Sequence, residues 1–145
     1  MLQFNRHYLQ LIRKPVHFVS FGFGSGLCTP APGTWGSGLA LLLIWPATTL
    51  LSFWWFFAAT IGCTLLGIWC SEQTANAMAI PDPGAIVIDE FAGMMVGSMP
   101  LWWLPAGSLF TGLSGLIVVF ILFRIFDILK PGPIKWADQR FNGGF

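Results

Sequence analysis

Two adjacent carboxylates stand at the edge of a long uncharged stretch. Asp89 and Glu90 immediately precede Phe91–Phe123, which contains no Asp, Glu, Lys or Arg. Carboxylates beside so apolar a segment are costly unless they are solvated, paired or bound to a cation. A structural role as helix N-terminal residues is the alternative, because acidic side chains there also favour the helix dipole. Neighbouring residues on a helix point about 100° apart, so we expect at most one of the two to face a given site.

Charged residues recur where this uncharged stretch ends. Arg124 and Asp127 are three residues apart and therefore share a helix face, Lys130 follows three residues later, and Pro131 ends the helix. An interfacial salt bridge would satisfy Arg124 and Asp127 without any ligand. Combined with the carboxylate pair, however, the cluster supplies oxygen ligands for a hard cation and positive charges for a phosphate.

A glycine- and proline-rich loop, Gly24–Ser37, precedes the first continuous apolar run. Glycine permits close backbone approach, Thr34 or Ser37 can cap a helix, and free amides at a helix N-terminus attract anions. The loop therefore fits a phosphate cradle, and a tight helix-packing loop fits it equally well. It lacks the GK[ST] of a P-loop and the strand–helix setting of a dinucleotide fingerprint.

Other familiar chemistries find no support in the sequence. His7 and His17 lie far in sequence from any carboxylate and receive no predicted role. Cys28, Cys63 and Cys70 are odd in number and form no CxxC, which argues against a disulfide framework or a zinc site. With a formal net charge of +1, the sequence shows no excess of clustered Lys and Arg of the kind that binds nucleic acid.

The composition indicates that the solvent of this chain is a lipid bilayer. Of the 145 residues, 55% are hydrophobic and 9% are charged, against about one quarter charged in soluble domains. Phe18–Ser71 is a second stretch without charge. A helix of about 20 apolar residues crosses a bilayer core, so each uncharged stretch can hold more than one crossing.

We predict an all-α polytopic membrane protein with about four transmembrane helices in two hairpins. The helices are expected near residues 37–50, 54–71, 86–103 and 106–126. Pro46 followed by interfacial Trp54 predicts the first turn, and Trp102 between Pro100 and Pro105 predicts the second. The polar composition of residues 71–83 predicts a loop outside the membrane.

This topology gathers the charged residues at one membrane face. Four crossings place the basic N-terminus, Met1–Lys14, and the basic C-terminal tail on the same side, which the positive-inside rule makes cytoplasmic. Met1–Lys14 is either an amphipathic segment lying in the membrane interface or a frayed tail. The sequence does not reveal an oligomeric state.

Three segments together resemble a known family. The loop Gly24–Ser37, the run Asp89-Glu90-Phe91 with Gly93, and the run from Phe123-Arg124 to Pro133-Ile134 occur in the order seen in phosphatidylglycerophosphatase A. The resemblance implies a single domain over residues 1–145. It also implies a magnesium-dependent lipid phosphatase of the bacterial inner membrane, which hydrolyses phosphatidylglycerophosphate to phosphatidylglycerol and phosphate.

With this resemblance, each charged group receives a role. Mg²⁺ would be bound by three carboxylates, those of Asp89, Glu90 and Asp127. The phosphate would be bound by two side chains and by the loop, through Arg124, Lys130, Gly33, Thr34 and Ser37. Attack on phosphorus by a metal-bound water and attack by a carboxylate both stay open.

The chain also departs from the family pattern. Family members continue after the segment at Asn142-Gly143-Gly144 with a paired-aspartate motif and a further hydrophobic helix, whereas this chain ends at Phe145. We therefore expect a chain that lacks the family's C-terminal segment. The alternatives are an inactive truncated homologue, a phosphatase of another diacyl lipid, and a non-enzymatic membrane protein such as a transporter subunit or assembly factor. A transporter would carry ionisable groups near mid-span, and Phe91–Phe123 has none.

Overall fold

The computed structural model describes residues 3–4, 11–78, 84–105, 108 and 111–129 of the chain. Within them lie five α-helices, three short 3₁₀ helices and one pair of two-residue strands. The helices are α1 (Pro15–Ser20), α2 (Pro32–Leu50), α3 (Phe53–Met78), α4 (Ile88–Ser98) and α5 (Leu113–Leu129), with η2 (Leu11–Arg13), η3 (Ser25–Leu27) and η4 (Met99–Trp103). The strands β1 (Gln3–Phe4) and β2 (Cys28–Thr29) pair antiparallel, Gln3 opposite Thr29. The predicted all-α class is confirmed, and most of Met1–Lys14 lies outside the described residues.

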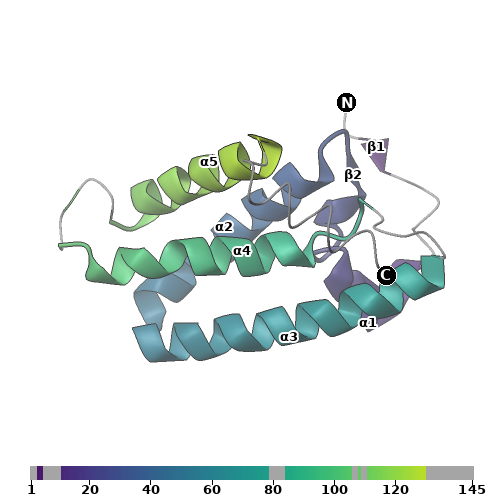
Figure 1. Ribbon diagram of the computed structural model, residues 1–145, viewed down its shortest axis with the longest axis horizontal. Helices are drawn as coiled ribbons and strands as arrows, with labels where there is room; N and C mark the ends of the chain where they lie inside the picture. The colour runs from purple at the N-terminus through teal and green to yellow at the C-terminus, as the bar shows by residue number, and fades with distance from the viewer. Residues whose placement is uncertain (1–2, 5–10, 79–83, 106–107, 109–110, 130–145) are drawn as a thin grey trace.

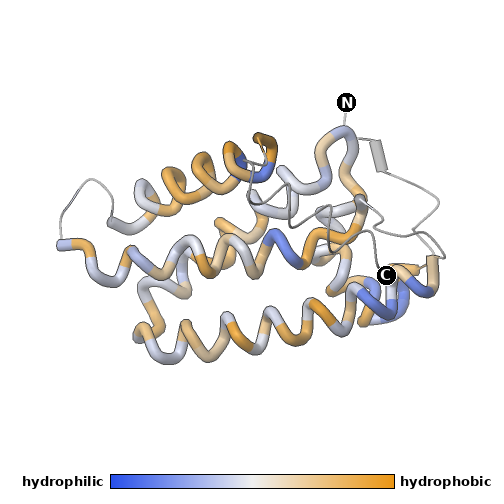
Figure 2. The backbone as a smooth tube through the Cα atoms, in the orientation of Figure 1, coloured by the Kyte–Doolittle hydropathy of each residue, from blue (hydrophilic) through white to orange (hydrophobic). Residues whose placement is uncertain are grey.

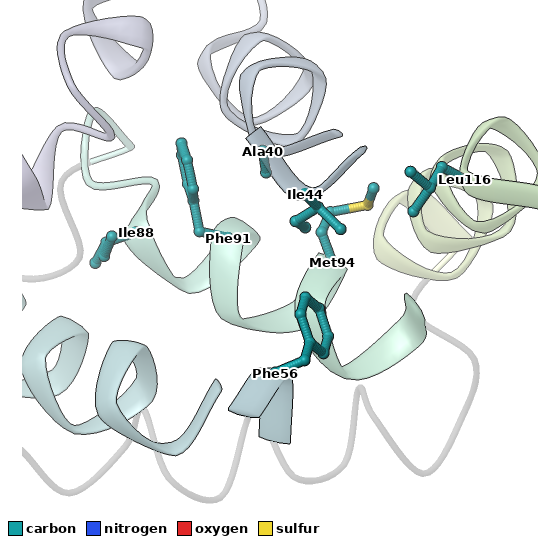
Figure 3. Close-up of a cluster of buried hydrophobic side chains, with 7 residues drawn as sticks. All are labelled: Ala40, Ile44, Phe56, Ile88, Phe91, Met94 and Leu116. Atoms are coloured by element: carbon teal, nitrogen blue, oxygen red, sulfur yellow. The ribbon is translucent and has the colours of Figure 1, made fainter. Parts of the chain in front are cut away.

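Helix α4 is the centre of the arrangement, although it has only 11 residues. It lies between α3 and α5, and α2 packs against both α4 and α5 (Figure 1). The main core joins these four helices through Ala40 and Ile44 of α2, Phe56 of α3, three residues of α4 and Leu116 of α5; the α4 residues are Ile88, Phe91 and Met94 (Figure 3). Every other long helix is therefore positioned relative to α4.

The first hairpin is present, and its turn agrees with the predicted helix bounds of 37–50 and 54–71, although α2 begins earlier than predicted. Pro46 lies inside α2, which begins at Pro32 and continues to Leu50, so the turn falls at Leu51 and Ser52. An interior proline removes one helix hydrogen bond and tends to kink or break a helix, but α2 continues past Pro46. The threonine hydroxyls that follow bond back into the helix, because Thr48 donates to the Trp45 carbonyl at 2.7 Å. The polar residues after Pro46 therefore extend the helix.

The predicted loop over residues 71–83 is wrong in its first part. Helix α3 continues through Ser71 to Met78, which places Glu72, Gln73 and Asn76 on a helix. Glutamate, glutamine, alanine and methionine are good helix formers, and packing of α1 against this end of α3 holds it in place. Residues 79–83 lie outside the described part of the chain.

Helix α3 is the one helix among the described residues with the length and apolar composition to cross a membrane. Its 26 residues span about 39 Å. The four transmembrane helices predicted from the sequence are therefore not confirmed. The second hairpin is nevertheless present as α4, η4 and α5, with α5 running from Leu113 to Leu129 rather than from 106 to 126.

Two glycines on α4 allow α5 to approach closely. A Cβ on Gly93 would lie 2.5 Å from the Phe123 ring, and a Cβ on Gly97 would lie 3.1 Å from Val119. Their spacing is that of a GxxxG motif, which packs membrane helices through small residues. The motif sets the distance between α4 and α5, and both helices carry charges.

Those charges lie at one end of the bundle. The start of α4, the end of α5 and the end of α3 are the hydrophilic segments of the long helices, and they lie at the same end (Figure 2). The opposite end carries the aromatic side chains of the α2–α3 turn and η4, where Phe53 contacts Trp103 with ring centroids 4.5 Å apart. The predicted gathering of charge at one face therefore agrees with the fold.

A buried histidine fastens α1 to α3. His17 is almost fully buried, and its Nδ1 lies 2.9 Å from Thr74 Oγ1. The Thr74 hydroxyl donates its own proton to the Cys70 carbonyl, so His17 must donate from Nδ1. Burial, and secondarily the charge of Lys14, lower the pKa of His17 from its usual value.

We expect Gly93→Leu to destabilise the fold by about 2 kcal/mol, because the added side chain pushes Phe123 and α5 away from α4. The control is Gly62→Leu on α3, where nothing lies within 4 Å of an added Cβ. Both changes replace a helical glycine, so the gain in helix propensity is shared. Equal shifts in the melting temperature in detergent would contradict the packing role.

We expect His17 to make stability depend on pH below its unfolded pKa of about 6.5. Because the folded-state pKa is lowered, the unfolded chain binds the proton more readily, and stability falls as the pH drops below that value. His17→Gln keeps a donor for Thr74 and removes the titration. Between pH 7.5 and 5.5 the wild type should lose up to about 1 kcal/mol more than this variant in thermal denaturation.

Candidate functional site

An ion pair between α4 and α5 forms the centre of the charged end. Arg124 Nη1 lies 3.1 Å from Glu90 Oε1 and 3.3 Å from Oε2. The side chains are only 15% and 12% exposed. At this burial each charge depends on its partner, because removal of either one leaves the other without compensation.

Asp127 forms a second ion pair with the Nη1 atom of Arg124. Its Oδ2 lies 3.0 Å from Arg124 Nη1, one helical turn along α5, and its side chain is 39% exposed. Nη1 thus bridges two carboxylates. The Arg124 Nε is buried and has no hydrogen-bond partner among the residues that the structure describes.

Helix α2 fixes the position of Glu90. Ser37 is fully buried, and its hydroxyl lies 2.9 Å from Glu90 Oε2 and 2.8 Å from the Gly33 carbonyl. A Cβ on Gly33 would overlap Glu90 Oε1 and lie 3.1 Å from Arg124 Nη1. The ion pair therefore rests directly on the backbone of the first turn of α2.

The loop residues lie near the site, but not in the roles that the sequence predicted. The residue before α2 is Ala31, and neither Thr34 nor Ser37 caps the helix, which begins at Pro32. Trp35 N already donates to the Ala31 carbonyl at 3.2 Å. Pro32 has no amide hydrogen. The amides of this turn that remain for the predicted phosphate cradle are therefore those of Gly33 and Thr34.

Asp89 points to the other side of α4. It lines a cavity of about 480 Å³ between α3 and α4, together with Ser71 and Glu72 of α3. This separation follows from the 100° between neighbours on a helix, as the sequence indicated. Asp89 and Glu90 thus face two different compartments.

The predicted site is therefore assembled only in part. Glu90, Arg124 and Asp127 meet as expected, with Gly33 beside them. Among the described residues no three Asp, Glu, His or Cys side chains come together around one point, so the predicted carboxylate trio does not converge. Lys130 follows the last described residue of α5 and lies outside the described residues.

Sequence reasoning missed the contact between Ser37 and Glu90. The two residues are 53 positions apart, and a serine after a glycine-rich loop was interpreted as a phosphate ligand. A usable signal existed in the spacing of Gly33 and Ser37. Four residues apart, they share one face of a helix, and a face made of small residues predicts close contact with another element.

A family model confirms the resemblance. The model for phosphatidylglycerophosphatase A matches residues 18–145. The chain belongs to this family. Two relatives carry the same name. The protein from Haemophilus influenzae is 40% identical over 132 residues, covering 91% of this chain and 77% of the relative. The protein from Escherichia coli is 38% identical over 136 residues, covering 90% of this chain and 72% of the relative. No solved structure matches the chain.

In this phosphatidylglycerophosphatase A homologue, the matched segment contains every described residue of the charged cluster. It also contains Ser37, Gly33 and the GxxxG motif of α4. The site described above is therefore part of the region that defines the family.

We expect Arg124→Met to destabilise the fold by about 3 kcal/mol, because it leaves the carboxylate of Glu90 buried without its counter-charge. Adding Glu90→Gln should restore much of the loss. Asp127→Asn, at a more exposed carboxylate, should cost no more than about 1 kcal/mol. Thermal unfolding of four variants in detergent, with Glu90→Gln alone as the fourth, measures these differences. Independent, additive effects of the two substitutions in the double variant would contradict the coupling.

Proposed function

We propose that this chain hydrolyses phosphatidylglycerophosphate to phosphatidylglycerol and inorganic phosphate. Family membership and the names of both relatives support the reaction. Arg124 is the observation that locates the reaction in the structure. This arginine lies at the charged end of α5, and its Nε has no hydrogen-bond partner among the described residues. Arginine is the side chain best suited to phosphate oxygens.

In this reaction a water oxygen bonds to the terminal phosphorus, and the bond from phosphorus to the glycerol oxygen breaks. Negative charge develops on the phosphoryl oxygens and on the leaving oxygen. Arg124 would stabilise that charge through its guanidinium group, together with the amides of Gly33 and Thr34. Lys130 stays a predicted second cation.

We further propose that Mg²⁺ takes part, held by Glu90 and Asp127. Magnesium binds through one or two carboxylates, and substrate phosphates and water complete its coordination. Two carboxylates that already share the Arg124 nitrogen fit such a donor set. The two carboxylates carry more negative charge than the single arginine can neutralise. An added cation would offset this excess and so favour binding of a phosphate. Asp89 lies on the far side of α4 and is left out of this pair.

The position of Glu90 would depend on Ser37. The Ser37 hydroxyl and the Arg124 guanidinium orient both carboxylate oxygens, so Ser37 is a positioning residue and not a phosphate ligand. Preorganised charge is effective because it need not rearrange as the reaction proceeds.

The proposed setting is the cytoplasmic membrane, with several crossings and the charged end at the cytoplasmic face. The apolar length of α3, the exposed Trp54 and Trp55 at the opposite end, and the basic residues predicted for the charged side support this orientation. The substrate is a diacyl phospholipid, so a site at the bilayer surface is where its headgroup lies.

The test is phosphate release from phosphatidylglycerophosphate in mixed micelles, with Mg²⁺ and with a chelator. We expect Arg124→Gln to lower kcat/KM by about 100-fold or more, because one phosphate donor is lost. Arg13→Gln, a described cation outside the charged cluster, is the matched control and should retain activity.

The same assay separates the roles of the carboxylates. Asp127→Asn and Glu90→Gln should weaken the response to Mg²⁺, whereas Ser37→Ala should lower kcat more than Ser98→Ala, an equally buried serine that bonds only within α4. Full Mg²⁺-dependent release by Asp127→Asn would refute its ligand role. Absence of phosphate release by the wild type would refute the proposed reaction.

A further inference from the structure

The cavity between α3 and α4 has no role in the reaction proposed above. Its volume of about 480 Å³ lies in the range of small-molecule and lipid sites, about 300–1,000 Å³. On α3 it is lined by residues of one helix face, from Thr64 through Ile68 and Ser71 to Ala75. The cavity thus runs along about three turns of α3, beside the first turns of α4.

Its lining differs at the two ends. The part at the charged end of the bundle is lined by the polar residues Ser71, Glu72 and Asp89 and by the apolar residues Ala75, Ile86 and Ile88. Towards the middle of α3 the lining is Thr64, Gly67, Ile68 and Ala92. The Thr64 hydroxyl donates to the Thr60 carbonyl at 2.8 Å, so its proton is engaged within the helix. A largely apolar cavity that carries both of its charged side chains at one end matches an amphiphile.

The cavity lies next to surface that faces lipid in a membrane. The neighbouring α3 side chains Leu65, Ile68 and Trp69 are at least half exposed, and so is Val96 on the same side of α4. Leu65, Ile68 and Trp69 belong to the apolar length of α3, the one described helix that can cross a membrane. A chain entering the cavity from the bilayer would therefore leave one apolar environment for another, at little desolvation cost.

We propose that the α3–α4 cavity binds an acyl chain of the lipid phosphate substrate, with the acyl-bearing glycerol beside Asp89. This inference rests on the proposed function. Asp89 and Glu90 are consecutive, so the polar end of the cavity adjoins the Glu90–Arg124 ion pair across one turn of α4.

The charges of the two compartments set the orientation of the lipid. Glu72 and Asp89 repel a phosphate monoester, which carries between one and two negative charges at neutral pH, whereas Arg124 attracts it. A phosphodiester and a glycerol unit separate the terminal phosphate of the substrate from its acyl chains. That spacer lets the chains lie on the α3 side of α4 while the phosphate lies on the α5 side.

The kinetic test compares two phenylalanine substitutions on α3. Thr64→Phe fills the apolar end of the cavity, and Leu65→Phe adds the same group on the outward face of the helix. For a long-chain lipid phosphate, Thr64→Phe should raise KM about tenfold, since contacts with about two methylenes are lost. Its kcat, and its KM for glycerol phosphate without acyl chains, should stay within about twofold of wild type.

Ala92→Leu narrows the cavity from α4 and should show the same pattern, which keeps the test intact if Thr64→Phe does not fold. Melting temperatures identify a misfolded variant. If both cavity variants fold and resemble Leu65→Phe in their KM for the long-chain substrate, the proposal is overturned. A wild type that releases no phosphate from any substrate refutes the proposed function instead.

A binding experiment tests the cavity without catalysis. A lipid phosphate with a photoreactive diazirine on its acyl chain is bound in nanodiscs and crosslinked, and the labelled peptides are mapped by mass spectrometry. We expect labels at 64–68 and 92, reduced severalfold in Thr64→Phe and retained in Leu65→Phe. Labelling spread evenly over the lipid-facing helices, or unchanged in Thr64→Phe, would overturn the proposal.

Discussion

Burial of one arginine between two carboxylates constrains the rest of this structure. Arg124 and Glu90 come from different helices, and neither charge is tolerated in so apolar a bundle without the other. Their contact requires α5 to lie close to α4, which Gly93 and Gly97 allow, and α2 to lie close to both, which Gly33 allows. The close contacts at the glycines of α2 and α4 and the ion pair therefore depend on one another.

The same close packing around the ion pair explains why α4, a helix of only 11 residues, can hold the bundle together. Helix α4 offers glycines to α5, Ile88 and Phe91 to the core and a carboxylate to each side. Consecutive Asp89 and Glu90 divide the charged end into two compartments, one that contains Arg124 and one whose charged lining is Glu72 and Asp89. Under the proposed function, a single turn of helix separates the phosphate of the lipid from its acyl chains.

The sequence predicted those features that depend on local spacing. Periodicity and composition gave the helical class, Arg124 and Asp127 were placed on one face, and the angle between Asp89 and Glu90 was anticipated. Features decided by tertiary contact were missed. Helix α3 passes through Glu72 and continues to Met78, where α1 packs against its end. The partner of Ser37 lies 53 residues away, beyond the reach of any local pattern.

The first turn of α2 touches Glu90 and Arg124 with bare backbone, and no side chain lies between them to absorb movement. Helices in a bilayer tilt to match their apolar length to the thickness of the hydrocarbon layer. A tilt of α2 against α4 would be transmitted to the two charges without loss. In the proposed membrane setting, the chain lengths of the surrounding lipids would thereby affect the geometry of the ion pair, and enzymatic rate would depend on bilayer thickness.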